Sequence, residues 1–135
     1  MLNLLKDLNN TTTKPLNQNK MKTSELRIGN YLNYQNSTEI ATVVLINEKH
    51  FDCRNEDEIF TPNGNYEPIK LIFPWLMIFG FKELEKDYRT FFKKGKFKVE
   101  LSSSGNVYYG KLYIGYVHQL QNLYFALTGN ELKIK

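Results

Sequence analysis

A basic and aromatic segment at residues 88–98, YRTFFKKGKFK, holds the side chains of this chain that are best suited to chemistry. It contains five cations and four aromatic rings, with no acidic residue between Arg89 and Lys98. Cations neutralise phosphates, and exposed aromatic rings stack on unpaired bases. The segment therefore predicts a site for nucleic acid or, alternatively, for an acidic protein surface. The candidate binding residues are Arg89, Phe91, Phe92, Lys93, Lys94, Lys96 and Lys98.

The same segment also fits an ordinary amphipathic hairpin with a tight turn at Lys94-Gly95. Apolar and charged residues alternate over residues 96–101, KFKVEL, as in a strand with one inward face. On this interpretation the lysines are solvated and protect a sheet edge. However, Phe91 and Phe92 are adjacent, so both cannot point inward from a regular strand. A binding role therefore stays open beside the purely structural one.

A polar group near the C-terminus supplies three further candidates for partner binding. Apolar residues recur at helical spacing from Val117 to Leu127, and Gly129 stands where a helix end needs a left-handed residue. The polar side of this predicted helix contains His118, Gln119 and Gln121. Such side chains can bind base edges or peptide backbones, or they can cap and orient the helix itself. The sequence leaves both roles open.

Metal and enzyme chemistry are weakly represented. His50 and Cys53 lie close together, but zinc needs about four ligands and the second histidine, His118, is distant. We expect Cys53 to be a buried and inert strand residue. The acidic run at residues 48–58 lacks a known ligand spacing and predicts a solvated loop. Phosphate-binding glycine loops, nucleophile elbows and zinc-hydrolase motifs are not found, so we expect no metal, no cofactor and no enzymatic activity.

The elements that position these residues are predicted to be mainly strands. Strands are expected at residues 28–34, 40–46, 49–53, 69–72, 97–101 and 107–114, with turns at 62–65 and 102–106. Pro74 suits the start of a short helix that buries Trp75, Leu76 and Phe79 and stops at Gly80, with Phe81 packing back on it. The fold class is therefore α+β, with a small SH3-like or curved β-unit, a short helix, a β-meander and a C-terminal helix.

Length and charge place these elements in one domain. The 135 residues carry a net charge of +4, and residues 1–22 contribute four lysines and one aspartate to it. Residues 1–21 are expected to form a flexible N-terminal extension, and residues 22–135 a single α+β domain. We find no apolar run long enough for a membrane span and no secretion signal. Together with the single cysteine, these features predict a cytoplasmic protein without a membrane partner.

Three blocks carry a resemblance to a known group of proteins: ELRIGNYLN at residues 25–33, WLMIFGF at 75–81 and YVHQLQNLYFALTG at 116–129. The chain resembles small uncharacterised proteins common in phages and prophages of Bacteroidetes. The resemblance implies a phage or prophage protein acting in the host bacterial cytoplasm. Phage proteins of this size without catalytic motifs often bind a host machine.

The first expectation is therefore a non-catalytic counter-defence inhibitor of a host defence complex. An anti-CRISPR protein that binds an RNA-guided, RNA-targeting nuclease or its guide RNA is the specific guess. Its partners would be a host protein or ribonucleoprotein, with RNA as a further candidate. The alternatives are a stand-alone RNA- or DNA-binding accessory protein, and a virion or assembly component that self-associates through the tyrosine-rich strand. The oligomeric state stays open.

Overall fold

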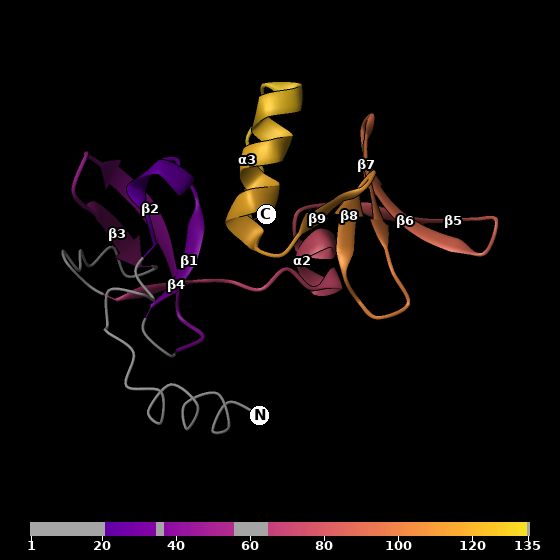
Figure 1. Ribbon diagram of the computed structural model, residues 1–135, viewed down its shortest axis with the longest axis horizontal. Coiled ribbons are helices and arrows are strands. Elements are labelled where there is room, and N and C mark those ends of the chain that lie inside the picture. The colour runs from indigo at the N-terminus through magenta and orange to yellow at the C-terminus, as the bar shows by residue number, and fades with distance from the viewer. Residues whose placement is uncertain (1–20, 35–36, 56–64, 135) are drawn as a thin grey trace.

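The computed structural model describes residues 21–34, 37–55 and 65–134. Three sequence-based expectations lie wholly or mostly outside these ranges: the N-terminal extension, the turn at 62–65 and the acidic residues at 56–58. Within them the chain forms two antiparallel sheets and two α-helices, which confirms the α+β class (Figure 1). An SH3-like barrel stays a prediction, as does the division into an extension and one domain.

The first sheet has the strand order β3-β2-β1-β4 and the second the order β5-β6-β7-β8-β9. A short 3-10 helix, η2 (Thr23–Glu25), precedes the first sheet. The first sheet consists of β1 (Tyr31–Tyr34), β2 (Ile40–Ile46), β3 (Phe51–Asn55) and β4 (Tyr66–Pro68). The second consists of β5 (Lys82–Lys86), β6 (Arg89–Lys94), β7 (Phe97–Leu101), β8 (Val107–Tyr109) and β9 (Leu112–Ile114). The helices are α2 (Phe73–Ile78), between the sheets in sequence, and α3 (Val117–Thr128).

The first sheet differs from the prediction at three strands. The strand expected at residues 49–53 is β3, which runs from Phe51 to Asn55. β1 begins three residues later than expected, because Gly29 has φ +99° and Asn30 Oδ1 accepts a hydrogen bond from the Arg27 amide at 2.7 Å. These residues form a turn before the strand. The strand expected at residues 69–72 is also wrong: β4 ends at Pro68, and only Lys70 makes an isolated bridge, with Tyr116. β2 has the predicted bounds.

The second sheet is the predicted meander with more hairpins than expected. The single strand predicted at residues 107–114 is instead a hairpin, since Gly110 takes φ +59° and turns the chain between β8 and β9. The turn after β6 lies at Gly95-Lys96, one residue later than expected, because Lys94 still pairs with Phe97. β5 was not predicted, although it pairs with β6 along its whole length.

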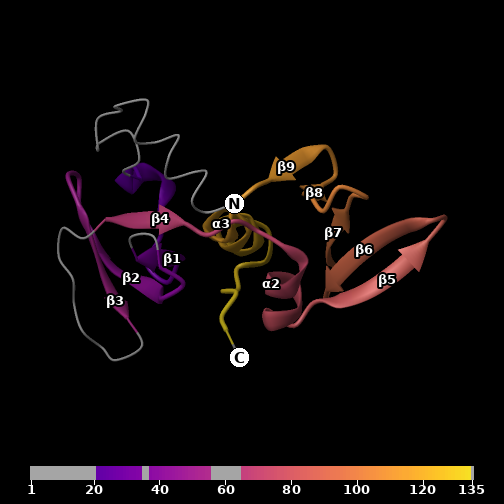
Figure 2. The ribbon, with the colours of Figure 1, turned by 90° about the horizontal axis from the view of Figure 1, so that it is seen from below.

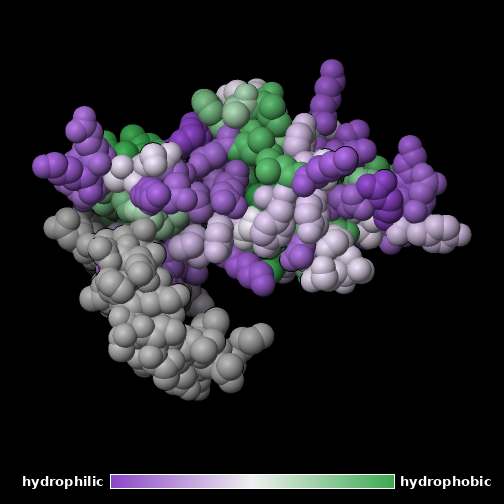
Figure 3. Space-filling model, in the orientation of Figure 1, coloured by the Kyte–Doolittle hydropathy of each residue, from purple (hydrophilic) through white to green (hydrophobic). Residues whose placement is uncertain are grey.

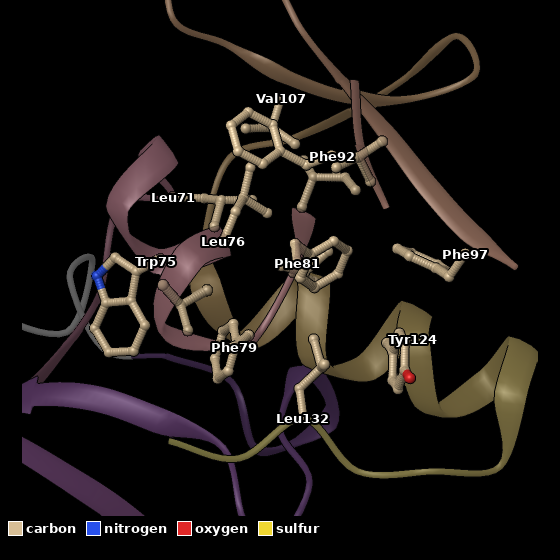
Figure 4. Close-up of a cluster of buried hydrophobic side chains, with 14 of the residues drawn as sticks. Leu71, Trp75, Leu76, Phe79, Phe81, Phe92, Phe97, Val107, Tyr124 and Leu132 are labelled. Carbon is tan, nitrogen blue, oxygen red and sulfur yellow. The ribbon is translucent and has the colours of Figure 1, made fainter. Parts of the chain in front are cut away.

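The main core lies between the second sheet, α2 and α3 (Figure 4). Trp75, Leu76 and Phe79 are buried as predicted, Gly80 ends the helix with φ +89°, and Phe81 packs into the same cluster. A smaller cluster fills the inner face of the first sheet; it consists of Leu26, Leu32, Ala41, Val43, Cys53 and Tyr66. The ring of Tyr31, on β1, packs against the main cluster, since its centroid lies 6.3 Å from that of Trp75 and 6.2 Å from that of Phe79.

The C-terminal helix lies between the two sheets (Figures 1 and 2). Its apolar residues Val117, Leu120 and Tyr124 are buried, and it ends at Gly129 with φ +75°, as predicted. On its far side the second sheet continues into the β5–β6 hairpin, which extends away from the rest of the molecule in both views (Figures 1 and 2). All five residues of β5 are exposed, so no element in the described part of the chain covers either face of that strand.

Candidate nucleic-acid interface

The basic segment lies in the second sheet, and strand alternation divides it between two faces. Phe92 is 1% exposed and belongs to the core, whereas its neighbour Phe91 is only partly buried on the opposite face. Partners directly opposite each other in an antiparallel ladder share a face, so the register extends this division across all five strands. We call the face of Phe91 the outward face. Its members are Lys82, Leu84, Lys86, Arg89, Phe91, Lys93, Lys98, Glu100, Tyr108 and Tyr113.

Three lysines form a row across the outward face. Lys93 is paired with Lys82 on one side and with Lys98 on the other, and all three side chains are exposed. Directly opposite side chains have Cβ atoms about 4.5–5.5 Å apart, and like charges at that spacing destabilise a sheet. The row therefore concentrates positive charge at a cost to the free protein. A bound anion would remove that cost.

An apolar and aromatic row runs beside the lysines. Its members, strand by strand, are Leu84, Phe91, Tyr108 and Tyr113, and the carboxylate of Glu100 interrupts the row between Phe91 and Tyr108. Leu84 is 45% and Tyr113 51% exposed, and the Tyr108 and Tyr113 rings lie 5.6 Å apart. Cations flank the Phe91 ring, with Lys98 Nζ 4.6 Å and the Arg89 guanidinium carbon 5.1 Å from its centroid.

One ion pair crosses the outward face. Arg89 binds Glu100 through two hydrogen bonds, of 2.8 Å from Nε and 2.5 Å from a terminal nitrogen. These hydrogen bonds lower the pKa of Glu100 and raise that of Arg89. Glu100 is the only carboxylate that the register places among the five cations of the outward face. The face therefore keeps a strong positive charge.

Four of the seven predicted residues of this segment come together on the outward face: Arg89, Phe91, Lys93 and Lys98. The other three do not. Phe92 is buried in the core, and Lys96 lies in the turn after β6. Lys94 points to the opposite face, where its Nζ donates to the Phe79 carbonyl at 2.5 Å and lies 6.0 Å from the Tyr124 ring centroid. Strand alternation separates Lys94 from Lys93, although both stand in the same basic run.

The sequence reasoning missed the contributions of β5, β8 and β9. Lys82 completes the row of three lysines, and Lys86 lies opposite Arg89 on the same face. Tyr108 and Tyr113 extend the aromatic row. A signal for β5 was present in residues 82–86, KELEK, where two lysines and a leucine alternate with glutamates. Such a strand has low intrinsic β propensity, and its two exposed faces remove the usual apolar signature.

The polar residues of α3 have internal roles. Gln121 is 1% exposed; its Oε1 accepts from the Tyr31 amide at 2.9 Å, and its Nε2 donates to the Gly29 and Leu132 carbonyls. Gln119 Oε1 accepts from the amides of Gly115 and Tyr116 and so caps the helix. Gln121 therefore holds the helix to β1, and the Gln119 oxygen holds the start of the helix. A binding role for the exposed Gln119 stays a prediction.

His118 is also buried. His118 is 2% exposed, its Nδ1 finds no hydrogen-bond partner among the described residues, and burial lowers the pKa of the imidazole. A buried ring of this kind packs as a core residue, here stacked with its centroid 5.9 Å from that of the Tyr116 ring. His118 therefore does not belong to the candidate interface.

Other candidate sites offer less. Cys53 is fully buried, and burial raises the pKa of its thiol to about 12, so it is the inert strand residue expected. The His50 ring contacts Asn47 in the turn before β3. A pocket of about 150 Å³ beside Tyr34 and Tyr66 is smaller than the roughly 300 Å³ of typical ligand sites. Among the residues that the structure describes, no cluster of His, Cys, Asp and Glu could hold a metal ion.

Hydrophilic residues predominate over the β5–β6 end of the molecule in Figure 3. No helix in the described part of the chain has the length and hydropathy to cross a bilayer. Comparison with protein-family models, with curated proteins and with solved structures found no match to this chain. The outward face, with five cations and three aromatic rings on one sheet surface, is therefore the candidate that the geometry of this chain itself provides.

Proposed function

We propose that the protein is a non-catalytic binding protein whose outward face holds single-stranded nucleic acid. The observation that carries the proposal is the row of three directly opposed lysines, Lys82, Lys93 and Lys98, beside a row of aromatic rings. A chain of phosphates would neutralise the lysines and relieve their mutual repulsion. The neighbouring rings would accept unpaired bases, which stack on aromatic side chains with about 1–3 kcal/mol per base.

The surface favours a single strand over a duplex for a geometric reason. Phe91, Tyr108 and Tyr113 lie on a sheet face, not on a helix that could enter a groove. Bases must be unstacked from their own neighbours before such rings can contact their faces, and this is possible in single strands, loops and ends. RNA and DNA strands share the required chemistry, so the binding experiment has to include both.

The counter-defence role implied by the resemblance is a second candidate and would use the same surface. A guide RNA exposed on a host nuclease presents the same phosphates and bases as a free strand, so the lysine row suits both. The outward face would then contact the guide RNA of the complex. The virion or assembly role stays a prediction, and a measurement of mass in solution tests it, because a monomer would contradict it.

The first experiment is a titration of fluorescent single-stranded RNA, single-stranded DNA and duplex DNA at several salt concentrations. The test variant replaces Lys82, Lys93 and Lys98 by Gln. The matched control replaces Lys49, Lys70 and Lys133 by Gln, which removes the same charge from exposed positions outside the outward face. We expect the test variant to lose affinity about 100-fold and its log–log salt slope to fall by roughly 2, because each phosphate contact on a single strand contributes about 0.7.

Two outcomes would contradict the proposal. One is a wild-type protein that binds no single strand at low salt. The other is an equal loss of affinity in both triple variants, which would make the binding a property of net charge alone. Capture of the tagged protein from a host lysate, with and without ribonuclease, then separates the two candidate roles. A nuclease complex captured by the wild type but not by the lysine-row variant supports the counter-defence role.

A further inference from the structure

The turn that joins β5 to β6 has an unusual residue in a demanding backbone conformation. Asp87 and Tyr88 are its two central residues, with φ of 54° and 63°, and they follow and precede the paired residues Lys86 and Arg89. Two-residue hairpin turns with both φ values positive favour Asn or Asp at the first position and Gly at the second. Asp87 fits this preference. Tyr88 does not, because a Cβ atom in the left-handed region is strained.

No contact of the Tyr88 ring within the described residues offsets this strain. Tyr88 is fully exposed, more so than any other large hydrophobic residue in the described ranges. Neither a ring contact nor a hydrogen bond from its side chain is found within the described ranges. A glycine here would relax the backbone without exposing any core surface. The aromatic ring is therefore best explained by a contact outside this chain.

The position of Tyr88 indicates the chemistry of that contact. Lys86 and Arg89, which flank the turn, are both on the outward face. Tyr88 immediately precedes β6 and stands three residues before Phe91 in the sequence. Tyr88 thus lies at the hairpin tip, beyond the last paired residues of the outward face and adjacent in sequence to Arg89. Tyrosine also loses little rotamer entropy on binding, because it has only two χ angles.

We propose that Tyr88 stacks on a base of the single strand that crosses the outward face, at the end of the binding track. This inference rests on the proposed function and deepens it, because it assigns the hairpin tip to base contact and not to phosphate contact. A cation at the tip would serve phosphate binding equally well without an aromatic ring. The two cations beside the turn bind the neighbouring phosphates of the strand, and the Tyr88 ring stacks on the base between those phosphates.

The test compares Tyr88→Gly with Tyr88→Phe in the full chain. Tyr88→Gly removes the ring and restores the preferred turn residue, so we expect a higher thermal midpoint together with about tenfold weaker binding of single-stranded RNA or DNA. The salt slope should stay unchanged, because no phosphate contact is lost. Tyr88→Phe keeps the ring and the strain, and should keep both the wild-type affinity and the wild-type midpoint. A purely structural role for Tyr88 could not weaken binding while stability rises.

The outcomes separate this inference from the proposed function. If the wild type binds in a lysine-dependent manner and Tyr88→Gly binds equally well, base stacking at the tip is overturned and the proposed function stands. If the wild type binds no strand, the proposed function itself fails. If Tyr88→Gly keeps its affinity for oligonucleotides but loses capture of a host protein, the ring fits a protein pocket, and base stacking is again overturned.

Discussion

The two sheets of this molecule use their second faces in opposite ways. Both bury one face in a hydrophobic cluster. The first sheet also turns residues of its other face toward the rest of the chain, since Tyr31 and Ile40 pack against the main core. The second sheet leaves its other face to solvent and covers it with lysines and aromatic rings. The same strand alternation thus produces a face that packs against the main core in the first sheet and a solvent-exposed face in the second.

This difference indicates which sheet can tolerate groups that serve binding at a cost to stability. A sheet packed on both faces has no room for repulsive or strained groups, because each residue must complement its neighbours. A sheet packed on one face tolerates directly opposed lysines and a strained tyrosine, as long as the buried face holds the strands together. The stability of the second sheet should therefore depend on its inner face, and binding on its outer one.

The largest expected effect separates the two faces at adjacent residues. Phe92→Ala removes a ring that is 1% exposed and should lower the free energy of unfolding by about 3–5 kcal/mol. Phe91→Ala should lower it by less than about 1 kcal/mol, because its ring lies on the outward face, but should weaken binding of single-stranded nucleic acid. Urea unfolding followed by circular dichroism measures the unfolding free energies of both variants. Similar losses of stability would break the distinction between the faces.

The next effect tests whether the first sheet depends on its second face. Tyr31→Ala removes the ring that packs on Trp75 and Phe79, so we expect a loss of roughly 2–3 kcal/mol in unfolding free energy. Tyr31 and Phe91 are both partly buried aromatics on the second face of their sheet, which makes Phe91→Ala the matched control. If Tyr31→Ala were as mild as Phe91→Ala, the first sheet would not need this contact.

A smaller effect concerns the carboxylate on the outward face. Glu100→Gln removes that negative charge and releases Arg89 from its ion pair, so affinity for a single strand should rise roughly threefold, the scale of an exposed charge interaction. Glu83→Gln is the control, since Glu83 is exposed on the opposite face, across from Phe92. Titration at low salt measures the change. Equal gains in both variants would show that binding follows net charge and not the outward face.

The smallest expected effect is a pH dependence from the helix between the sheets. Burial lowers the pKa of His118, so the unfolded chain takes up a proton more readily than the folded chain. Stability should therefore fall as the pH drops below the ordinary histidine pKa of about 6.5. Urea unfolding between pH 7.5 and about 5 measures this loss, above the range where most carboxylates titrate. A His118→Gln variant that keeps the full wild-type pH dependence in that window would contradict this assignment.

Part of the candidate site could be predicted from the sequence alone. The adjacency of Phe91 and Phe92 showed that one ring leaves the core, and the structure confirms this by burying only Phe92. Which ring faces outward depends on where the sheet meets α2 and α3, and strand periodicity carries no such information. β5 was missed because KELEK has no apolar face, and Lys82 and Lys86 were missed with it.

The polar residues of α3 show the opposite limit. Gly129 predicted the end of this helix, and the spacing of the apolar residues predicted the helix that carries these polar side chains. Their function could not be predicted, because Gln121 bonds to residues 29 and 31, which are about 90 positions away in the chain. A buried amide with all its partners supplied by distant backbone looks, in sequence, the same as an exposed amide that awaits a ligand.

The sequence by itself determined the local features of this protein: the α+β class, the helix from Val117 to its glycine end, the Trp75 helix and the alternation of the basic segment. These depend on residues within a few positions of each other, where periodicity and backbone preference suffice. Only the tertiary structure decided which lysines share a face, which glutamine is buried and which sheet keeps an open surface. Those outcomes depend on register and on packing between distant segments, so a sorting of residues into faces exists only once the chain has folded.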